Sequence, residues 1–300
     1  MKQSSQLGCK VLFVAVLLLA PQLAGAASLN VGSISISPVV ETRKFWPLAN
    51  YLGQRLKSEG IDEGKVVVAD SIPAMTALMQ KGQADIYIDS FYPSLAVSRL
   101  AGSKLLLRRW KLGKSDYQSV IFTRKDSSIS RLEDLRGRVI AFEEPFSSSG
   151  YFFPKMVLLE KGFRLAPKLQ GSDPVKSDEL GYIFSHVDSN TILLVLNRIA
   201  AAGAIDNQKY LTLAKNLDSL KVLHETASFP RQIVSYREDL PAKLVARVKQ
   251  LLLSMHRIEE GQQVLKAFEE TTMFDEIPDR DLKLVDGLRK HIDAELKLQR

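Results

Sequence analysis

Residues 138–160 read RVIAFEEPFSSSGYFFPKMVLLE, and this stretch decides the fold of the region around it. Arg138-Val-Ile-Ala-Phe142 has the β-branched and aromatic content of a strand, and the residues from Tyr151 to Glu160 have the apolar content of a helix. Between them stand three serines and a glycine, at residues 147–150. A helix start exposes backbone N–H groups and the positive end of the peptide dipoles, so it stabilises an anion.

The serines allow two interpretations. In the first, the hydroxyls of Ser147, Ser148 and Ser149 add hydrogen-bond donors to an anion site, and Gly150 lets the backbone come close to the ligand. In the second, a serine is an ordinary N-cap, because its side chain accepts a hydrogen bond from the first turn of a helix. The segment alone leaves both open.

The N-terminus has the pattern of a secretory signal peptide. Lys2 and Lys10 precede the apolar run 11–20, and an Ala-Gly-Ala triplet ends at Ala26. Cleavage there would leave 274 of the 300 residues, a length that suits two domains. The chain's single cysteine, Cys9, precedes the apolar run, so we expect no lipoprotein anchor, no disulfide and no cysteine metal site in the exported protein.

The net charge is mildly basic and spread along the chain. It is +7 for all 300 residues, and +5 once Lys2 and Lys10 are removed with the leader. Arg108 and Arg109, with Lys111 and Lys114, lack the aromatic interleaving of a nucleic-acid surface, and we interpret them as solvated. No nucleic-acid partner is expected.

Extended and helical patterns alternate after the leader, as in βαβ units with mostly parallel sheets. We expect two doubly wound α/β lobes joined by two hinge crossings, near residues 115–118 and 230–236. Beyond residue 236 the pattern is wholly helical, and this tail is expected to pack on the first lobe. The predicted parts are a signal peptide at 1–26, lobe 1 at 27–117 and 233–300, and lobe 2 at 118–232.

Longer motifs point to a family. Residues 135–154, LRGRVIAFEEPFSSSGYFFP, together with Ser185-His186 and Gly203-Ala-Ile-Asp206, are similar to motifs of the phosphate/phosphite/phosphonate-type periplasmic solute-binding proteins of ABC transporters. Residues 47–52 and 82–86 and the pair Leu240-Pro241 also resemble that family. The resemblance implies the type II periplasmic-binding-protein fold, a periplasmic location, and delivery of a small oxyanion to an ABC permease.

The resemblance also implies a site. Ser147, Ser148 and Ser149 would donate to the oxyanion, with Gly150 beside them. His186 would add a donor from the opposite side of lobe 2, and Asp206 would close the pocket or meet a cationic part of the ligand. Charge-assisted hydrogen bonds of this kind are strong.

Lobe 1 departs from the family pattern. Ser71-Ile72 and Asp89-Ser90 stand where the family often has aromatic residues, although Tyr87, Phe91 or Tyr92 could substitute. A carboxylate of Asp89 facing the cleft would favour a ligand with an ammonium group, such as an aminoalkylphosphonate. The pocket-forming segments offer no recognisable Arg or Lys to compensate Asp89 and Asp206.

Some residues also fit other functions. Ser149, His186 and Asp206 are the residue types of a hydrolase triad, but the Gly-x-Ser-x-Gly turn is absent, so we expect no enzyme. No cluster of ligands has metal spacing, and neither a metal nor another cofactor is expected. The same fold also serves in periplasmic sensors that signal to a membrane partner, which stays an alternative to an importer. A monomer is expected.

Overall fold

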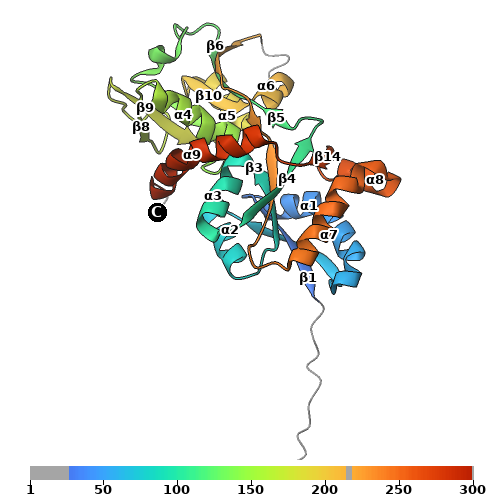
Figure 1. Cartoon of the computed structure of the whole chain (residues 1–300). Coiled ribbons are helices and arrows are strands. Elements are labelled where there is room, and N and C mark those ends of the chain that lie inside the picture. The colour runs from blue at the N-terminus through green and yellow to red at the C-terminus, as the bar shows by residue number, and fades with distance from the viewer. Residues whose placement is uncertain (1–26, 214–217, 299–300) are drawn as a thin grey trace, which may run out of the picture.

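Two six-stranded sheets organise the chain, each in its own lobe (Figure 1). The computed structural model describes residues 27–213 and 218–298, so the predicted signal peptide lies outside the described residues. Helices pack on both faces of each sheet. In one strand of the second sheet, for example, Ile121 belongs to one core while Val120 and Phe122 belong to the core on the opposite face. The predicted fold class, two α/β lobes, is confirmed.

The first sheet has the strand order β14-β4-β13-β3-β1-β2. Strands β1, β2 and β3 run parallel, whereas β13 is antiparallel to β3 and β4, and β14 is antiparallel to β4. The strands are β1 (Ser28–Ile34), β2 (Glu63–Ala69), β3 (Ile86–Ser90), β4 (Lys104–Lys111), β13 (Gln232–Tyr236) and β14 (Thr271–Asp275). The helices are α1 (Pro38–Arg55), η1 (Lys57–Glu59), α2 (Ile72–Gln80), α3 (Phe91–Ala101), α7 (Ala242–Ser254), η4 (Met255–Arg257) and α8 (Glu259–Ala267).

The second sheet has the order β11-β6-β10-β7-β9-β8. Strands β10, β7, β9 and β8 run parallel, and β6 is antiparallel to both its neighbours. The strands are β6 (Ser119–Arg124), β7 (Val139–Phe142), β8 (Arg164–Pro167), β9 (Glu179–Phe184), β10 (Ala202–Asp206) and β11 (Leu220–Glu225). The helices are η2 (Leu132–Leu135), a single π turn η3 (Ser148–Phe152), α4 (Phe153–Glu160), α5 (Asp188–Leu196) and α6 (Asn207–Leu213).

The chain crosses between the sheets twice, and the two crossings pair with each other. The first crossing carries β5 (Asp116–Tyr117) and the second carries β12 (Phe229–Pro230). The two short strands are antiparallel, with Tyr117 opposite Phe229. Their rings lie edge to face at 4.7 Å. A paired double connection of this kind fixes the position of the crossings while leaving the two sheets as separate units.

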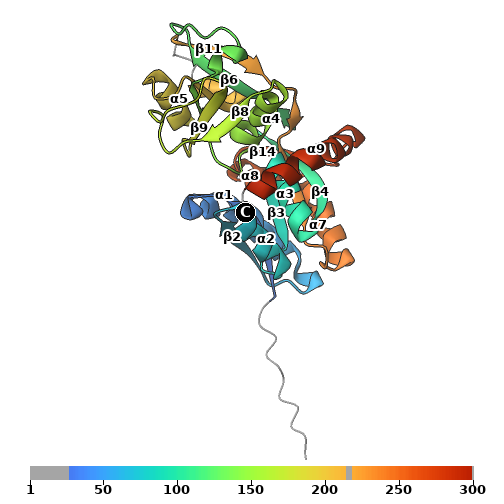
Figure 2. The same ribbon diagram turned by 90° about the vertical axis from the view of Figure 1, so that its left-hand side faces the viewer.

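Helix α9 (Asp279–Leu298) lies across the junction of the lobes (Figures 1 and 2). It packs against α3 of the first lobe through Leu288, Ile292 and Leu296. It also reaches the second lobe, because Lys155 donates to Glu295 at 2.6 Å and both side chains are buried. The tail therefore packs on the first lobe, as expected, and on the second lobe as well.

The lobes also touch at the start of α3. The Ser148 hydroxyl oxygen accepts a hydrogen bond from the backbone N–H of Tyr92 at 2.8 Å, and the rings of Tyr92 and Phe152 stack at 4.1 Å. An N–H group in the first turn of a helix has no partner within that helix. Ser148 therefore caps a helix of the opposite lobe.

The prediction that the chain is wholly helical beyond residue 236 is wrong at one place. Residues 271–275 form β14, the edge strand next to β4, and its Phe274 is fully buried. The strand has only five residues and stands between the amphipathic helices α8 and α9, so it scarcely disturbs the helical pattern of the sequence. Across residues 27–213 and 218–298, none of the helices is both long enough and apolar enough to cross a membrane.

Candidate functional site

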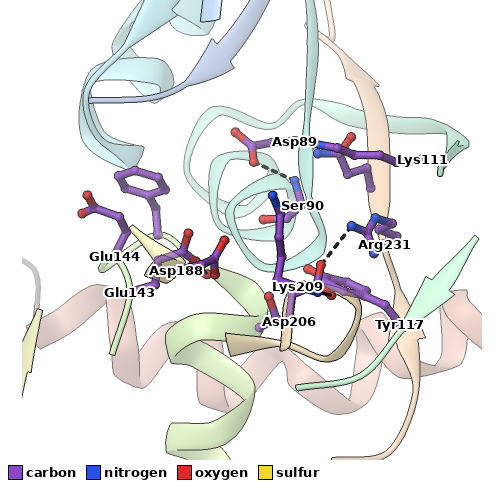
Figure 3. A pocket seen from close by; sticks show the side chains of 14 residues that line it. Asp89, Ser90, Lys111, Tyr117, Glu143, Glu144, Asp188, Asp206, Lys209 and Arg231 are labelled. Atoms are coloured by element: carbon purple, nitrogen blue, oxygen red, sulfur yellow. Dashed lines mark hydrogen bonds and ion pairs between the residues drawn. The ribbon is translucent and has the colours of Figure 1, made fainter. Parts of the chain in front are cut away.

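A cavity of about 200 Å³ lies between the two sheets (Figure 3). Its wall is built from the ends of β3, β4, β7 and β10 and from both crossings. Ligand sites in open α/β sheets form at the carboxyl ends of parallel strands, where connections diverge. The lining residues are Asp89, Ser90, Lys111, Tyr117, Glu143, Glu144, Phe146, Ser147, Ser149, Asp188, Asp206, Lys209, Arg231 and Gln232.

The serine turn, residues 147–150, begins a helix as predicted, and Ser147 is its N-cap. The Ser147 hydroxyl accepts from the backbone N–H of Gly150 at 2.9 Å and donates to Glu143 Oε2 at 2.6 Å. A side chain on Gly150 would place its Cβ 2.4 Å from the Glu143 Cβ, so only glycine fits here. Ser147 and Ser149 line the cavity, whereas Ser148 and Gly150 do not.

Of the two candidate residues in the first lobe, Asp89 lies in the cavity wall and Tyr92 does not. Asp89 lines the cavity, and its carboxylate accepts hydrogen bonds from the N–H groups of Ile34 and Ser90 and from the Tyr87 hydroxyl. Burial raises the pKa of Asp89 to about 7, against an ordinary value near 4. Tyr92 is fully buried against the second lobe and does not reach the cavity wall.

Asp206 lies in the cavity wall with both carboxylate oxygens engaged. Oδ1 accepts from the backbone N–H groups of Gln208 and Lys209, at 2.6 and 3.3 Å, and so caps α6. Oδ2 accepts from Arg231 Nη2 at 2.9 Å, in an ion pair whose side chains are 10% and 5% exposed (Figure 3). The nearest cation to Asp206 is therefore the protein's own arginine.

His186 lies outside the cavity wall. Its ring is 61% exposed, and Nδ1 is 3.1 Å from Glu144 Oε1. Its backbone has a φ of 70°, the left-handed region that few non-glycine residues adopt. Glu144 itself lines the cavity, so His186 is next to the wall rather than part of it. The direct contact between His186 and a ligand that the resemblance implies is not tested by this geometry.

Three cations line the cavity: Lys111, Lys209 and Arg231. The expectation that the pocket-forming segments hold no compensating Arg or Lys is therefore wrong. Lys111 ends β4, within the predicted lobe 1, and Arg231 follows β12, in the crossing predicted near residues 230–236. The sequence signal at each position was the basic residue itself.

The interpretation of Arg108 and Arg109 as solvated is also wrong. Both are buried, because β4 lies between β13 and β14 and is covered on both faces. Arg108 donates to Asp275 and Asp281, and Arg109 donates to Thr271 and to the carbonyl of Phe268. These arginines therefore hold the first lobe to β14 and α9.

The opposite wall of the cavity is acidic. Burial, together with the neighbouring Asp188, raises the pKa of Glu143, and burial also raises the pKa of Asp188 and Glu144. Figure 3 shows Glu143, Glu144 and Asp188 on one side and Lys111 and Arg231 on the other. The cavity thus offers positive and negative groups to one ligand.

The candidates for a hydrolase triad have other partners in this geometry. Asp206 pairs with Arg231 and His186 with Glu144, so no hydrogen bond joins the triad candidates Ser149, His186 and Asp206 in the part of the chain described. Among the same residues, no group of three or more His, Cys, Asp or Glu side chains could hold a metal ion.

Comparisons with solved structures agree on the fold. XAC2383 of Xanthomonas citri, solved with chloride and separately with ATP, matches with a TM-score of 0.85 in both cases; the chloride form is 24% identical and covers 90% of this chain and 99% of its own. PhnD1 of Prochlorococcus marinus, in complex with methylphosphonate, matches with a TM-score of 0.68 at 18% identity, over 89% of this chain and 98% of its own.

A phosphonate ABC transporter component of Pseudomonas aeruginosa also matches, with a TM-score of 0.68 at 19% identity, over 90% of this chain and 88% of its own. The family model for the periplasmic phosphonate substrate-binding protein of ABC transporters matches residues 34–282. That match covers every strand of both sheets except β1, of which it includes only Ile34, and it covers all the residues of the cavity wall. The chain therefore belongs to the family of periplasmic substrate-binding proteins of phosphonate ABC transporters.

Proposed function

We propose that this protein is the solute-binding component of an ABC importer and captures a small phosphonate-like oxyanion between its lobes. The observation that carries the proposal is the cavity itself, whose wall combines residues of both lobes and both crossings with the serine turn and three cations. Hydroxyl and cationic donors around one enclosed space suit an oxyanion, because charge-assisted hydrogen bonds are the strong kind.

The size of the cavity favours a small solute. Pockets for drug-sized ligands are about 300–1,000 Å³, and this one has about 200 Å³. Phosphate, phosphite, methylphosphonate and 2-aminoethylphosphonate are all small molecules of the required charge. A nucleotide is much larger, and we expect it to be excluded from the closed cavity.

The acidic wall refines the ligand class. Ionised Asp89, Glu143 and Asp188 would repel a bare dianion, whereas an ammonium group would satisfy them. A zwitterion such as 2-aminoethylphosphonate would place its phosphonate towards Arg231 and its amine towards Glu143 and Asp188. The alternative is an amine-free oxyanion, bound with these carboxyls protonated.

Residues of both lobes line the cavity, so movement of one lobe relative to the other would change its size. We propose hinge closure of lobe 1 (27–117 and 233–300) on lobe 2 (118–232) about the paired crossings. The hydrogen bond from the Tyr92 N–H to the Ser148 hydroxyl would form on closure. We propose that the protein works as a monomer, with both lobes of one chain forming the site.

Calorimetry of the mature protein with the four small oxyanions, and with ATP as a contrast, tests the proposal. We expect binding of at least one phosphorus oxyanion, tightest for 2-aminoethylphosphonate, and none of ATP. Binding of ATP with no response to the small oxyanions would contradict it. Ligand-dependent stimulation of the ATPase of the reconstituted permease would then distinguish an importer component from a periplasmic sensor.

A further inference from the structure

Arg231 is held in the cavity wall by three contacts, two with the first crossing and one with Asp206 at the end of β10. Its backbone N–H donates to the Ser115 carbonyl at 2.8 Å, in the other crossing. Its guanidinium carbon lies 4.7 Å from the centre of the Tyr117 ring, and Nη2 donates to Asp206 Oδ2. The residue is only 4% exposed, so its side chain has a defined position.

Two nitrogens of this guanidinium have no protein partner. Nε and Nη1 of Arg231 are buried, and no hydrogen bond to either is found within residues 27–213 and 218–298. Arginine stays protonated in proteins, and every N–H of its guanidinium is a donor. Leaving a buried donor without an acceptor costs free energy. Because Arg231 lines the cavity, an acceptor that enters the cavity can satisfy these N–H groups.

The other two cations are less suited to fixing a ligand. Lys111 is paired with Glu269 at 2.8 Å. Lys209 is exposed, and its amine is a single group on a flexible stem. Arg231 alone combines burial, a fixed position and uncommitted donors.

We propose that Arg231 binds the oxyanion of the ligand and that Asp206 is a positioning residue for Arg231, not a partner for a ligand amine. This rests on the proposed capture of an oxyanion in the cavity. Asp206 already accepts from Gln208, Lys209 and Arg231, so both of its oxygens are engaged. The selectivity for amines would then come from Glu143 and Asp188 across the cavity.

The experiment measures the dissociation constants of methylphosphonate and 2-aminoethylphosphonate by calorimetry. Arg231→Lys keeps the positive charge and a partner for Asp206 but loses the planar guanidinium with its fixed N–H donors. Arg231→Gln also removes the charge. We expect both ligands to bind about 10- to 100-fold more weakly to each variant, the equivalent of one charged hydrogen bond. Asp206→Asn should weaken both ligands by the same factor, because it acts through Arg231.

Arg237→Gln is the matched control. Arg237 follows the same strand β13 that Arg231 precedes, and it also pairs with a carboxylate, that of Asp85 at 2.7 Å, away from the cavity. We expect its ligand affinities to equal those of the wild type. Equal weakening by Arg237→Gln and Arg231→Gln would show a general effect on the fold and overturn the assignment.

If the wild type binds these ligands and both Arg231→Lys and Arg231→Gln bind them equally well, the role of Arg231 is overturned while the proposed function stands.

A selective loss of 2-aminoethylphosphonate affinity in Asp206→Asn would overturn the positioning role of Asp206. If the Arg231 variants fail to fold, the Nε–H resonance of Arg231 in the wild type decides: it shifts on adding methylphosphonate under the proposal, and an unchanged resonance contradicts it. A wild type that binds no phosphorus oxyanion overturns the proposed function, and the assignment with it.

Discussion

The serine turn at residues 147–150 and the second crossing, which carries β12 and leads into Arg231, both contribute to the cavity, but their hydrogen-bond donors differ in how many protein partners they already have. Ser147 already bonds Glu143 and Gly150, and Ser148 caps α3 of the other lobe. Arg231 keeps two donors uncommitted. The turn therefore contributes mainly shape and contact between the lobes, and the crossing contributes charge.

The largest effect is expected from removing the support of the serine turn. Lys155 lies on α4, which continues from the turn, and its buried pair with Glu295 joins the second lobe to α9. Lys155→Met removes one partner of a buried ion pair, which typically costs about 3–5 kcal/mol of unfolding free energy. Urea denaturation measures this. The exposed Lys161, just after α4, provides the control variant Lys161→Met, and equal stability of the two variants would contradict a structural role for the pair.

Within the turn, Ser149 is the serine expected to matter most for affinity. It lines the cavity beside Tyr117, whereas the hydroxyl of Ser148 faces the other lobe. Ser149→Ala should weaken methylphosphonate binding by about tenfold, the equivalent of about 1.5 kcal/mol for a hydrogen bond to a charged group. The exposed Ser128 gives the control Ser128→Ala. A greater loss in Ser148→Ala than in Ser149→Ala would reverse the assignment within the turn.

Asp89 lies in the part of the cavity wall contributed by lobe 1, and its titration should make the free energy of unfolding depend on pH. Burial raises its pKa to about 7 in the folded state, so the folded protein retains a proton that the unfolded chain releases from about pH 4 upward. The stabilisation is complete below about pH 4 and is lost as the pH rises through about 7. Relative to Asp89→Asn, the wild type should lose up to about 1.4 kcal/mol of unfolding free energy per pH unit in this window. Parallel stability curves of the two proteins would contradict a protonated Asp89.

The smallest effect is expected at His186. Its ring is mostly exposed and contacts the cavity only through Glu144. His186→Ala should change ligand affinity by no more than about twofold, as for other exposed positions. A loss of tenfold or more would restore the direct donor role that the family resemblance implies.

The sequence was most informative where one segment carries its own pattern. The strand, serine turn and helix of residues 138–160 follow one another as predicted, because local propensity and capping decide them. Ser147, Ser149, Asp89 and Asp206 do meet at one cavity.

The part of the site that the sequence did not predict depends on pairing between segments that are far apart in the chain. Arg231 lies beside Ser115 and Tyr117 only because β5 and β12 pair, and nothing near residue 231 indicates that partner. The uses of Ser148 and Asp206 within the protein, on Tyr92 and Arg231, also follow from tertiary contacts. A sequence pattern indicates which side chains can bind an anion, but it does not indicate which of them already have a hydrogen-bond partner within the protein.

A crystal structure of the mature protein with methylphosphonate is the most direct test that the cavity between the lobes captures an oxyanion. The account predicts the phosphonate inside this cavity, with an oxygen accepting from Nε or Nη1 of Arg231 and the lobes closed through Ser148 and Tyr92. A phosphonate bound outside the cavity, with Nε and Nη1 of Arg231 still without an acceptor, would contradict it.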